Sequence, residues 1–72
     1  MEVLVVGGGG REHAICYALK KNKDITKIYC APGNGGISDI AECLPGIKAT
    51  DLDGILEFVK AHPGISMTGV AP

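Results

Sequence analysis

The chain has 72 residues, of which 46% are hydrophobic and 21% are charged, and its formal net charge is −1. This composition is typical of a globular protein, and the length allows one small core that buries about 60% of the unfolded chain's surface. The sequence has no basic stripe with interleaved aromatic residues, which disfavours nucleic acid as a partner. The apolar run after Met1 is too short for a membrane span or a signal peptide, so we expect a cytoplasmic protein.

The N-terminal segment passes from an apolar run through glycines into a helical pattern. Residues 3–6, Val-Leu-Val-Val, predict a strand buried on both faces of a parallel sheet. Four glycines at 7–10 permit a tight turn and a close approach of another group to the backbone. A helix is expected over residues 11–22, and its first turn would direct unpaired N–H groups and the positive end of its dipole out of the glycine turn. This stretch therefore predicts a phosphate or carboxylate site.

A second strand and a second glycine-rich loop are predicted next. Residues 26–30, Thr-Lys-Ile-Tyr-Cys, indicate the strand. Residues 31–36, Ala-Pro-Gly-Asn-Gly-Gly, are turn formers and indicate the loop. Residues 37–44 are ambiguous, and one interpretation makes Ser38 the cap of a short helix in that segment.

The segment after the Pro-Gly pair at 45–46 predicts a short third strand and a second long helix. The strand is expected at residues 47–49. Asp51 is the favoured N-cap of the helix, with Thr50 as a competing cap, and the helix is expected to end near His62. Its predicted apolar stripe follows the spacing i, i+3, i+4, i+7: Leu52, Ile55, Leu56 and Val59.

A fourth strand is predicted at residues 65–70, after a second Pro-Gly pair. The resulting order is strand, helix, strand, weak helix, strand, helix, strand, which is typical of an α/β fold with a parallel sheet and right-handed crossovers. Ligands of such sheets bind at the carboxyl ends of the strands, close to the point where strand order reverses. Both glycine-rich loops leave such ends, so we expect them to face one crevice.

Two common nucleotide-binding motifs fit the first loop poorly. A dinucleotide-binding fingerprint would place its third glycine at Glu12 or His13, depending on the register, and neither side chain is small. The second predicted strand also ends without an acidic residue that could hold a ribose 2′-hydroxyl. A P-loop is disfavoured because no Gly-Lys-Ser or Gly-Lys-Thr follows the glycines.

The cysteines and histidines do not indicate a metal site. Cys16, Cys30 and Cys43 are odd in number and widely spaced, which favours reduced thiols in a core over a disulfide framework or a zinc site. His13 and His62 are too far apart in sequence to indicate a metal pair. We assign no catalytic residue and no metal ligand.

The two loops together resemble the start of a known enzyme family. Residues 7–14 read Gly-Gly-Gly-Gly-Arg-Glu-His-Ala, and residues 31–34 read Ala-Pro-Gly-Asn. In residue types, order and spacing, these motifs resemble the N-terminus of phosphoribosylamine-glycine ligase, and the resemblance covers essentially the whole chain. Members of that family join glycine to phosphoribosylamine at the expense of ATP in purine biosynthesis. They belong to the ATP-grasp superfamily, whose members begin with a Rossmann-like domain.

The resemblance implies that residues 1–72 are the N-terminal part of a Rossmann-like, pre-ATP-grasp domain. The segment would supply part of the phosphoribosylamine pocket. ATP, Mg²⁺ and glycine would be held by ATP-grasp domains that this chain lacks, so the segment alone is expected to be inactive and to act with the remaining domains of the same protein. The alternative is a stand-alone Rossmann-type module that binds a nucleotide or an anion.

The resemblance also implies a set of substrate-binding residues in both loops: Gly8, Gly9, Gly10, Arg11, Glu12, His13, Pro32, Gly33 and Asn34. The glycines would present N–H groups, and Arg11 would either contact a phosphate or remain solvated. Glu12 either binds substrate or complements the helix dipole, and His13 either transfers protons or, preferably, packs inside the loop. Asn34 either bonds a ribose hydroxyl, the favoured interpretation, or holds its own turn.

Two positions depart from the family's pattern. Gly35 stands where the family usually has alanine after Pro-Gly-Asn. The fourth strand of the family runs into Gly-Pro-Glu, whereas this chain has Ala71 and Pro72. The first departure loosens the second loop but leaves its Pro-Gly-Asn intact.

Overall fold

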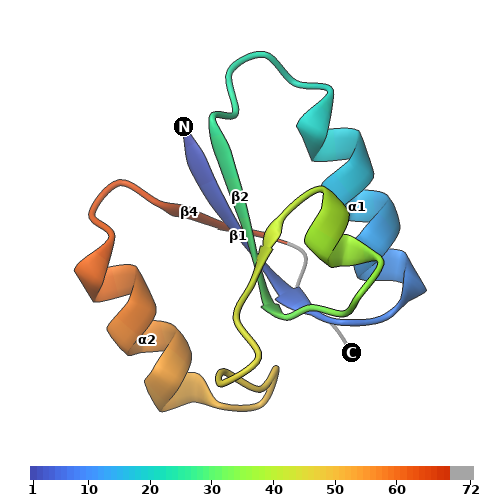
Figure 1. The fold of residues 1–72 in the computed structure, drawn as a ribbon. Helices are drawn as coiled ribbons and strands as arrows, with labels where there is room; N and C mark the ends of the chain where they lie inside the picture. The colour runs from blue at the N-terminus through green and yellow to red at the C-terminus, as the bar shows by residue number, and fades with distance from the viewer. Residues whose placement is uncertain (69–72) are drawn as a thin grey trace.

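Seven short elements alternate along residues 1–68, the part of the chain that the computed structural model describes. They are β1 (Glu2–Gly7), α1 (Gly10–Lys20), β2 (Lys27–Pro32), the 3₁₀ helix η1 (Ile37–Asp39), β3 (Glu42–Cys43), α2 (Leu52–Ala61) and β4 (Ser66–Thr68). The strands form one parallel sheet, and α1 and α2 lie on opposite sides of it (Figure 1). The predicted α/β class with about four parallel strands is confirmed.

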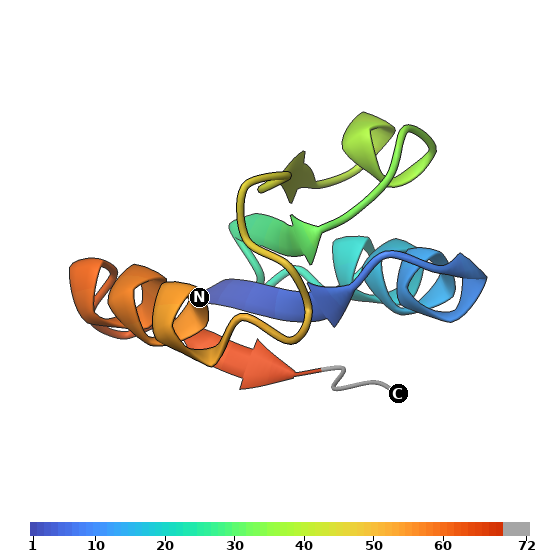
Figure 2. The same ribbon diagram turned by 90° about the horizontal axis from the view of Figure 1, so that it is seen from below.

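The strand order, β3-β2-β1-β4, reverses at β1. The chain proceeds from β1 outward to β2 and β3, and it then returns through α2 so that β4 pairs with the other edge of β1. Figure 2 shows the strands side by side in this order, with β3 uppermost and β4 lowest. Since open parallel sheets bind ligands near such a reversal, we expect a ligand-binding site at the carboxyl end of β1.

β1 is central and covered on both faces, as its uninterrupted apolar run predicts. Residues 3–6 are each 4% exposed or less. Successive side chains of a strand point to opposite faces, so β1 contributes to two separate clusters. The cluster on the side of α1 and η1 contains Val3, Val5, Cys16, Ile28, Cys30 and Ile37. The cluster on the side of α2 contains Leu4, Val6, Ala31 and Ile55.

The boundaries of α1, β2 and β4 lie close to the predicted ones. The sequence predicts α1 over 11–22, and the helix begins one residue earlier and ends two residues earlier. β2 extends beyond the predicted 26–30 because its last two residues still pair with β1. β4 occupies part of the predicted range 65–70. Residues 69 and 70 of that range lie outside the described part of the chain, as do residues 71 and 72, where the sequence departs from the family's Gly-Pro-Glu.

α2 begins and ends where its capping residues predict. Asp51, and not Thr50, is the N-cap, because its Oδ1 accepts a hydrogen bond from the N–H of Gly54 at 3.0 Å. The helix ends at Ala61, with His62 as the C-cap. Neither α1 nor α2 has the length and apolar character that a membrane span requires.

The face that α2 turns to the sheet differs from the predicted stripe. Leu52 and Leu56 are 70% and 54% exposed, so their predicted place in the core is wrong. The helix is rotated so that the ring of Phe58 packs against Tyr29 in a T-shaped arrangement, with ring centroids 5.0 Å apart. Such an aromatic pair contributes about 0.5–1.5 kcal/mol beyond its buried area. The stripe that faces the sheet consists of Ile55, Phe58 and Val59.

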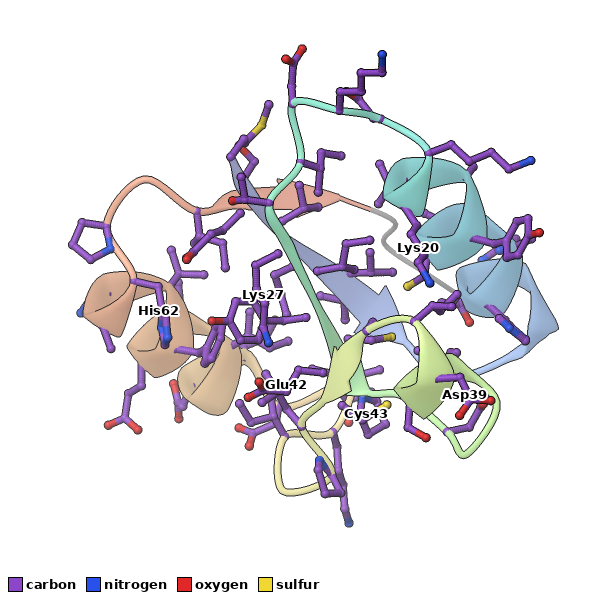
Figure 3. All side chains as sticks on the ribbon, turned by 45° about the horizontal axis from the view of Figure 1, so that its top comes forward. Lys20, Lys27, Asp39, Glu42, Cys43 and His62 are labelled. Carbon is purple, nitrogen blue, oxygen red and sulfur yellow. The ribbon has the colours of Figure 1, made fainter. Side chains whose placement is uncertain are left out.

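The third strand is β3 at Glu42–Cys43, so its predicted position at 47–49 is wrong. β3 pairs with the middle of β2. An ion pair between Lys27 and Glu42, with Nζ and Oε1 3.0 Å apart, joins the two strands, and Figure 3 shows these side chains pointing toward each other. The apolar side chains at 47 and 49 instead pack against the α2-side cluster from an irregular loop.

The predicted cap at Ser38 is also wrong. Ser38 lies inside η1, and its Oγ donates a hydrogen bond to the carbonyl of Gly35 at 2.6 Å. The side chain that accepts at the start of η1 is Asn34, whose Oδ1 receives the N–H of Ile37 at 3.0 Å. A loop residue three positions upstream therefore does what a cap would do.

Candidate functional site

The two glycine-rich loops leave the sheet side by side. Gly7 and Pro32 are register partners at the carboxyl ends of β1 and β2. The N–H of Gly33 donates to the carbonyl of Gly7 at 3.1 Å, and the thiol of Cys30 donates to the same carbonyl at 3.2 Å. Both loops therefore lie together at the edge where parallel sheets bind ligands.

Gly8 is the position at which the loops touch. A Cβ at Gly8 would lie 2.8 Å from the carbonyl oxygen of Gly33, closer than real Cβ atoms approach backbone oxygen. The side-chain amide of Asn34 donates a hydrogen bond to the carbonyl of Gly8. The glycine at this position permits the direct contact of the two loops, which a side chain would separate.

Glu12 turns back from α1 into the first loop. It is only 6% exposed, and its Oε1 accepts the N–H of Gly9 at 2.8 Å. Its Oε2 lies 3.5 Å from Nε of Arg11. The N–H of Gly9, one of the donors predicted to bind substrate, thus already donates to a carboxylate of the protein. This contact is one half of a capping box.

Gly9 is the N-cap of α1 and has no side chain to complete that capping box. A serine or aspartate at this position would accept an N–H of the first helical turn. The first-turn N–H groups of Gly10, Arg11 and Glu12 have no acceptor within the helix. They are therefore the donors best placed to receive an anion at the N-terminus of α1.

Arg11 and His13 lie on either side of this helix start. The Arg11 side chain is 67% exposed, and its charged contact with Glu12 is long. His13 is half-buried and lies against the second loop, because a Cβ at Gly36 would be 3.2 Å from its Cε1. It also lines a shallow hollow of about 430 Å³ with Gly10, Ala14 and Tyr17.

Asn34 uses both ends of its side-chain amide within the protein. Its NH₂ group donates to Gly8 and its oxygen accepts from Ile37. Gly33, directly before it, has a φ of 76°, a left-handed conformation that favours glycine. Pro32 is the last residue of β2. These contacts are the ones expected of a residue that holds the turn and joins the loops.

Two cysteine thiols donate hydrogen bonds to carbonyls of the loops. The sequence did not indicate this role for them. Cys30 donates to Gly7, and the thiol of the half-buried Cys43 donates to the carbonyl of Asn34 at 3.4 Å.

Burial raises the pKa of Cys16 and raises that of Cys30 to about 12, so both are neutral thiols. All three cysteines are free; Cys16 and Cys30 lie in the core as predicted, whereas Cys43 is only half-buried. Within residues 1–68, no group of three or more acidic, histidine or cysteine side chains is arranged to hold a metal ion.

The carboxylate of Glu12 makes the first loop sensitive to acid. The hydrogen bond from the Gly9 N–H lowers the pKa of Glu12 below its ordinary 4.5, burial opposes this effect, and Arg11 adds to it. Because the pKa of Glu12 is lower in the folded protein than in the unfolded chain, the ionised carboxylate stabilises the folded loop at pH values above the unfolded-state pKa. This stabilisation is lost as the pH falls through the lowered folded-state pKa.

We expect hydrogen exchange at the Gly9 amide, relative to its intrinsic rate, to become faster as the pH falls below 4.5, where Glu12 begins to be protonated. Glu12→Gln keeps an oxygen acceptor but does not titrate, so its relative exchange rate should stay level over the same range. Amide exchange measured on both proteins from neutral to acidic pH tests this. An equal acid response in both would assign the effect to another group.

A parallel sheet with glycine-rich loops at the carboxyl ends of its first two strands, the first loop leading into a helix N-terminus, defines a Rossmann-like domain. Residues 1–72 match the model of the family described as "Phosphoribosylglycinamide synthetase, N domain", and the chain belongs to that family. The predicted family resemblance is confirmed.

Bacterial relatives agree with this family. A phosphoribosylamine-glycine ligase of Caldanaerobacter subterraneus subsp. tengcongensis is 49% identical over 72 residues, which are 100% of this chain and 17% of the relative. One of Streptomyces coelicolor is 49% identical over 70 residues, covering 88% of this chain and 17% of the relative. One of Halalkalibacterium halodurans is 42% identical over 72 residues, covering 100% of this chain and 16% of the relative. The chain thus spans about one sixth of the length of these relatives.

Proposed function

We propose that residues 1–72 are the N-terminal, pre-ATP-grasp part of a cytoplasmic, ATP-dependent ligase that joins glycine to 5-phosphoribosylamine in purine biosynthesis. The family and the name of the relatives support the reaction. Within it, this segment binds the phosphate end of phosphoribosylamine through the loops at Gly8–Arg11 and Pro32–Asn34. ATP, Mg²⁺ and glycine bind to further domains of the same protein, and the segment alone turns over no substrate.

One observation carries the proposed site: Arg11 is exposed in the first turn of α1. The N-terminus of a helix already has positive potential, so a cation there is mildly unfavourable unless an anion lies beside it. A phosphate between the first-turn N–H groups and the guanidinium would satisfy both. Because Glu12 neutralises Arg11 only through a long contact, the guanidinium keeps donors for a ligand.

Arg11→Ala in the full-length protein is expected to raise the KM for phosphoribosylamine. A hydrogen bond to a charged group contributes about 1.5–3 kcal/mol, which corresponds to roughly 10- to 150-fold in affinity. Arg11→Lys should recover only part of this, because lysine lacks the planar two-pronged contact. Steady-state kinetics with each substrate varied in turn should show little change in the KM for ATP or glycine.

Lys20→Ala is the matched control, because it removes an exposed positive charge from the other end of the same helix. It should leave all three Michaelis constants unchanged. An unaltered KM for phosphoribosylamine in Arg11→Ala, or equal losses for all three substrates, would contradict the phosphate role. In the same assay, the 72-residue chain alone should release no phosphate above background.

A further inference from the structure

We propose that Glu12 and Asn34 are positioning residues that together fix the orientation of one peptide group, the one between Gly8 and Gly9. Neither residue needs to touch substrate for this role. The fixed peptide leads directly into the first turn of α1 and so sets the direction of the N–H groups and of Arg11. The inference rests on the proposed function, because it names what holds the phosphate-binding loop in place.

The Gly8–Gly9 peptide is held at both of its ends. Its carbonyl, on Gly8, accepts a hydrogen bond from the side-chain amide of Asn34. Its N–H, on Gly9, donates to Oε1 of Glu12 at 2.8 Å. A peptide group is planar and rigid, so these two contacts from different elements act on one body.

The side chains that hold this peptide are themselves held. Asn34 is fixed through the N–H of Ile37, at 3.0 Å from its Oδ1, and its own carbonyl accepts the thiol of Cys43. Glu12 is 6% exposed, and it extends from the first turn of α1. The two contacts therefore fix the position of the first loop relative to η1, β3 and α1.

The peptide needs such contacts because both of its residues are glycines. Glycine backbones rotate freely through conformations that other residues avoid, so an unrestrained Gly-Gly peptide samples several orientations. A flipped peptide would turn its carbonyl toward the Glu12 carboxylate and its N–H toward the NH₂ group of Asn34. Like groups would then face each other at both ends, so the two side chains select one orientation.

A double-mutant cycle in the full-length protein tests whether the two residues act through one peptide. Glu12→Ala and Asn34→Asp should each raise the KM for phosphoribosylamine by about two- to tenfold, the range for one hydrogen bond, with kcat little changed. Asn34→Asp keeps the oxygen that accepts from Ile37 but loses the donor to Gly8. The double variant should be little worse than the more severe single variant, because either loss already frees the peptide. A double effect equal to the product of the single effects would indicate independent ligand contacts and overturn the proposal.

The conservative variant Glu12→Gln supplies a rescue, since its side-chain oxygen still accepts from Gly9. It should keep the KM within about twofold of the parent protein. A loss as large as that of Glu12→Ala would show that the charge, and not the contact with the peptide, is what matters, and would overturn the role of Glu12.

Amide hydrogen exchange in ¹⁵N-glycine-labelled full-length protein gives a readout that requires no substrate. In Asn34→Asp, exchange at the Gly9 N–H should become faster even though Asn34 hydrogen-bonds this peptide only at its other end, the carbonyl of Gly8. Unchanged Gly9 exchange would refute the shared-peptide mechanism. Amides of β1 serve as the folding control and should keep their protection. If Arg11→Ala leaves the KM unaltered while Gly9 responds as expected, the proposed phosphate site fails and the positioning of the peptide stands.

Discussion

Leu4→Ala is expected to lower the free energy of opening of the central strand by about 2–5 kcal/mol. Leu4 is 0% exposed and is among the largest fully buried side chains of the described residues. It lies in β1 against Val6, Ala31 and Ile55 on the α2 side of the sheet. Truncation removes buried apolar surface and leaves a cavity that a central strand, paired on both edges, cannot collapse to fill.

This loss is large for a domain of this size, because folded proteins are stable by about 0.05–0.15 kcal/mol per residue. Amide hydrogen exchange of β1 in the full-length protein measures it, since exchange there reports the opening of this domain. Leu56→Ala is the matched control: the same atoms are removed from a side chain that is 54% exposed. It should cost less than about 0.5 kcal/mol. Equal losses at the two leucines would contradict the orientation of α2.

Gly33→Ala is the second substitution expected to be severe, at about 2–5 kcal/mol. The backbone of Gly33 has a φ of 76°, where a residue with a Cβ loses about 1–2 kcal/mol. The added Cβ would also overlap the side chain of Cys43 and lie 3.3 Å from the carbonyl of Cys30. Overpacking of this kind costs about 1–3 kcal/mol. The protection of the β2 amides from exchange and the melting temperature should both fall.

Two further variants separate the causes of that loss. Gly33→Ala combined with Cys43→Ala removes the overlap with the sulfur but keeps the strained φ and the Cβ of residue 43 at 2.9 Å, so at least about 1–2 kcal/mol of the loss should remain. Gly35→Ala is the control in the same loop, because an added Cβ there meets no atom within 4 Å. It should be neutral or slightly stabilising, since alanine loses less backbone entropy than glycine. Tolerance of alanine at both glycines would show that the turn has another conformation in solution.

The sequence by itself determined the features that depend on neighbours in the chain. The apolar run at 3–6 predicted a doubly buried strand, and Asp51 predicted the start of α2, because burial of a continuous apolar run and capping are decided within a few residues. The alternation of elements predicted the parallel α/β sheet. The two loop motifs predicted the family, which the match over residues 1–72 confirms. The nine proposed substrate-binding residues stay a prediction.

Only the tertiary structure decided the features that depend on distant partners. The third strand is at Glu42–Cys43 because those residues pair with the edge of β2, whereas Ile47 and Ala49 pack against the α2-side cluster. A strand this short has no local signal of its own. The rotation of α2 places Phe58 against Tyr29, a residue of β2 on the same face of the sheet. Glu12 and Asn34 are separated in sequence, and they hold one peptide because parallel pairing brings the ends of β1 and β2 together. The contact of Asn34 with Gly8 joins residues 26 positions apart, so no pattern in a short window of sequence can contain it.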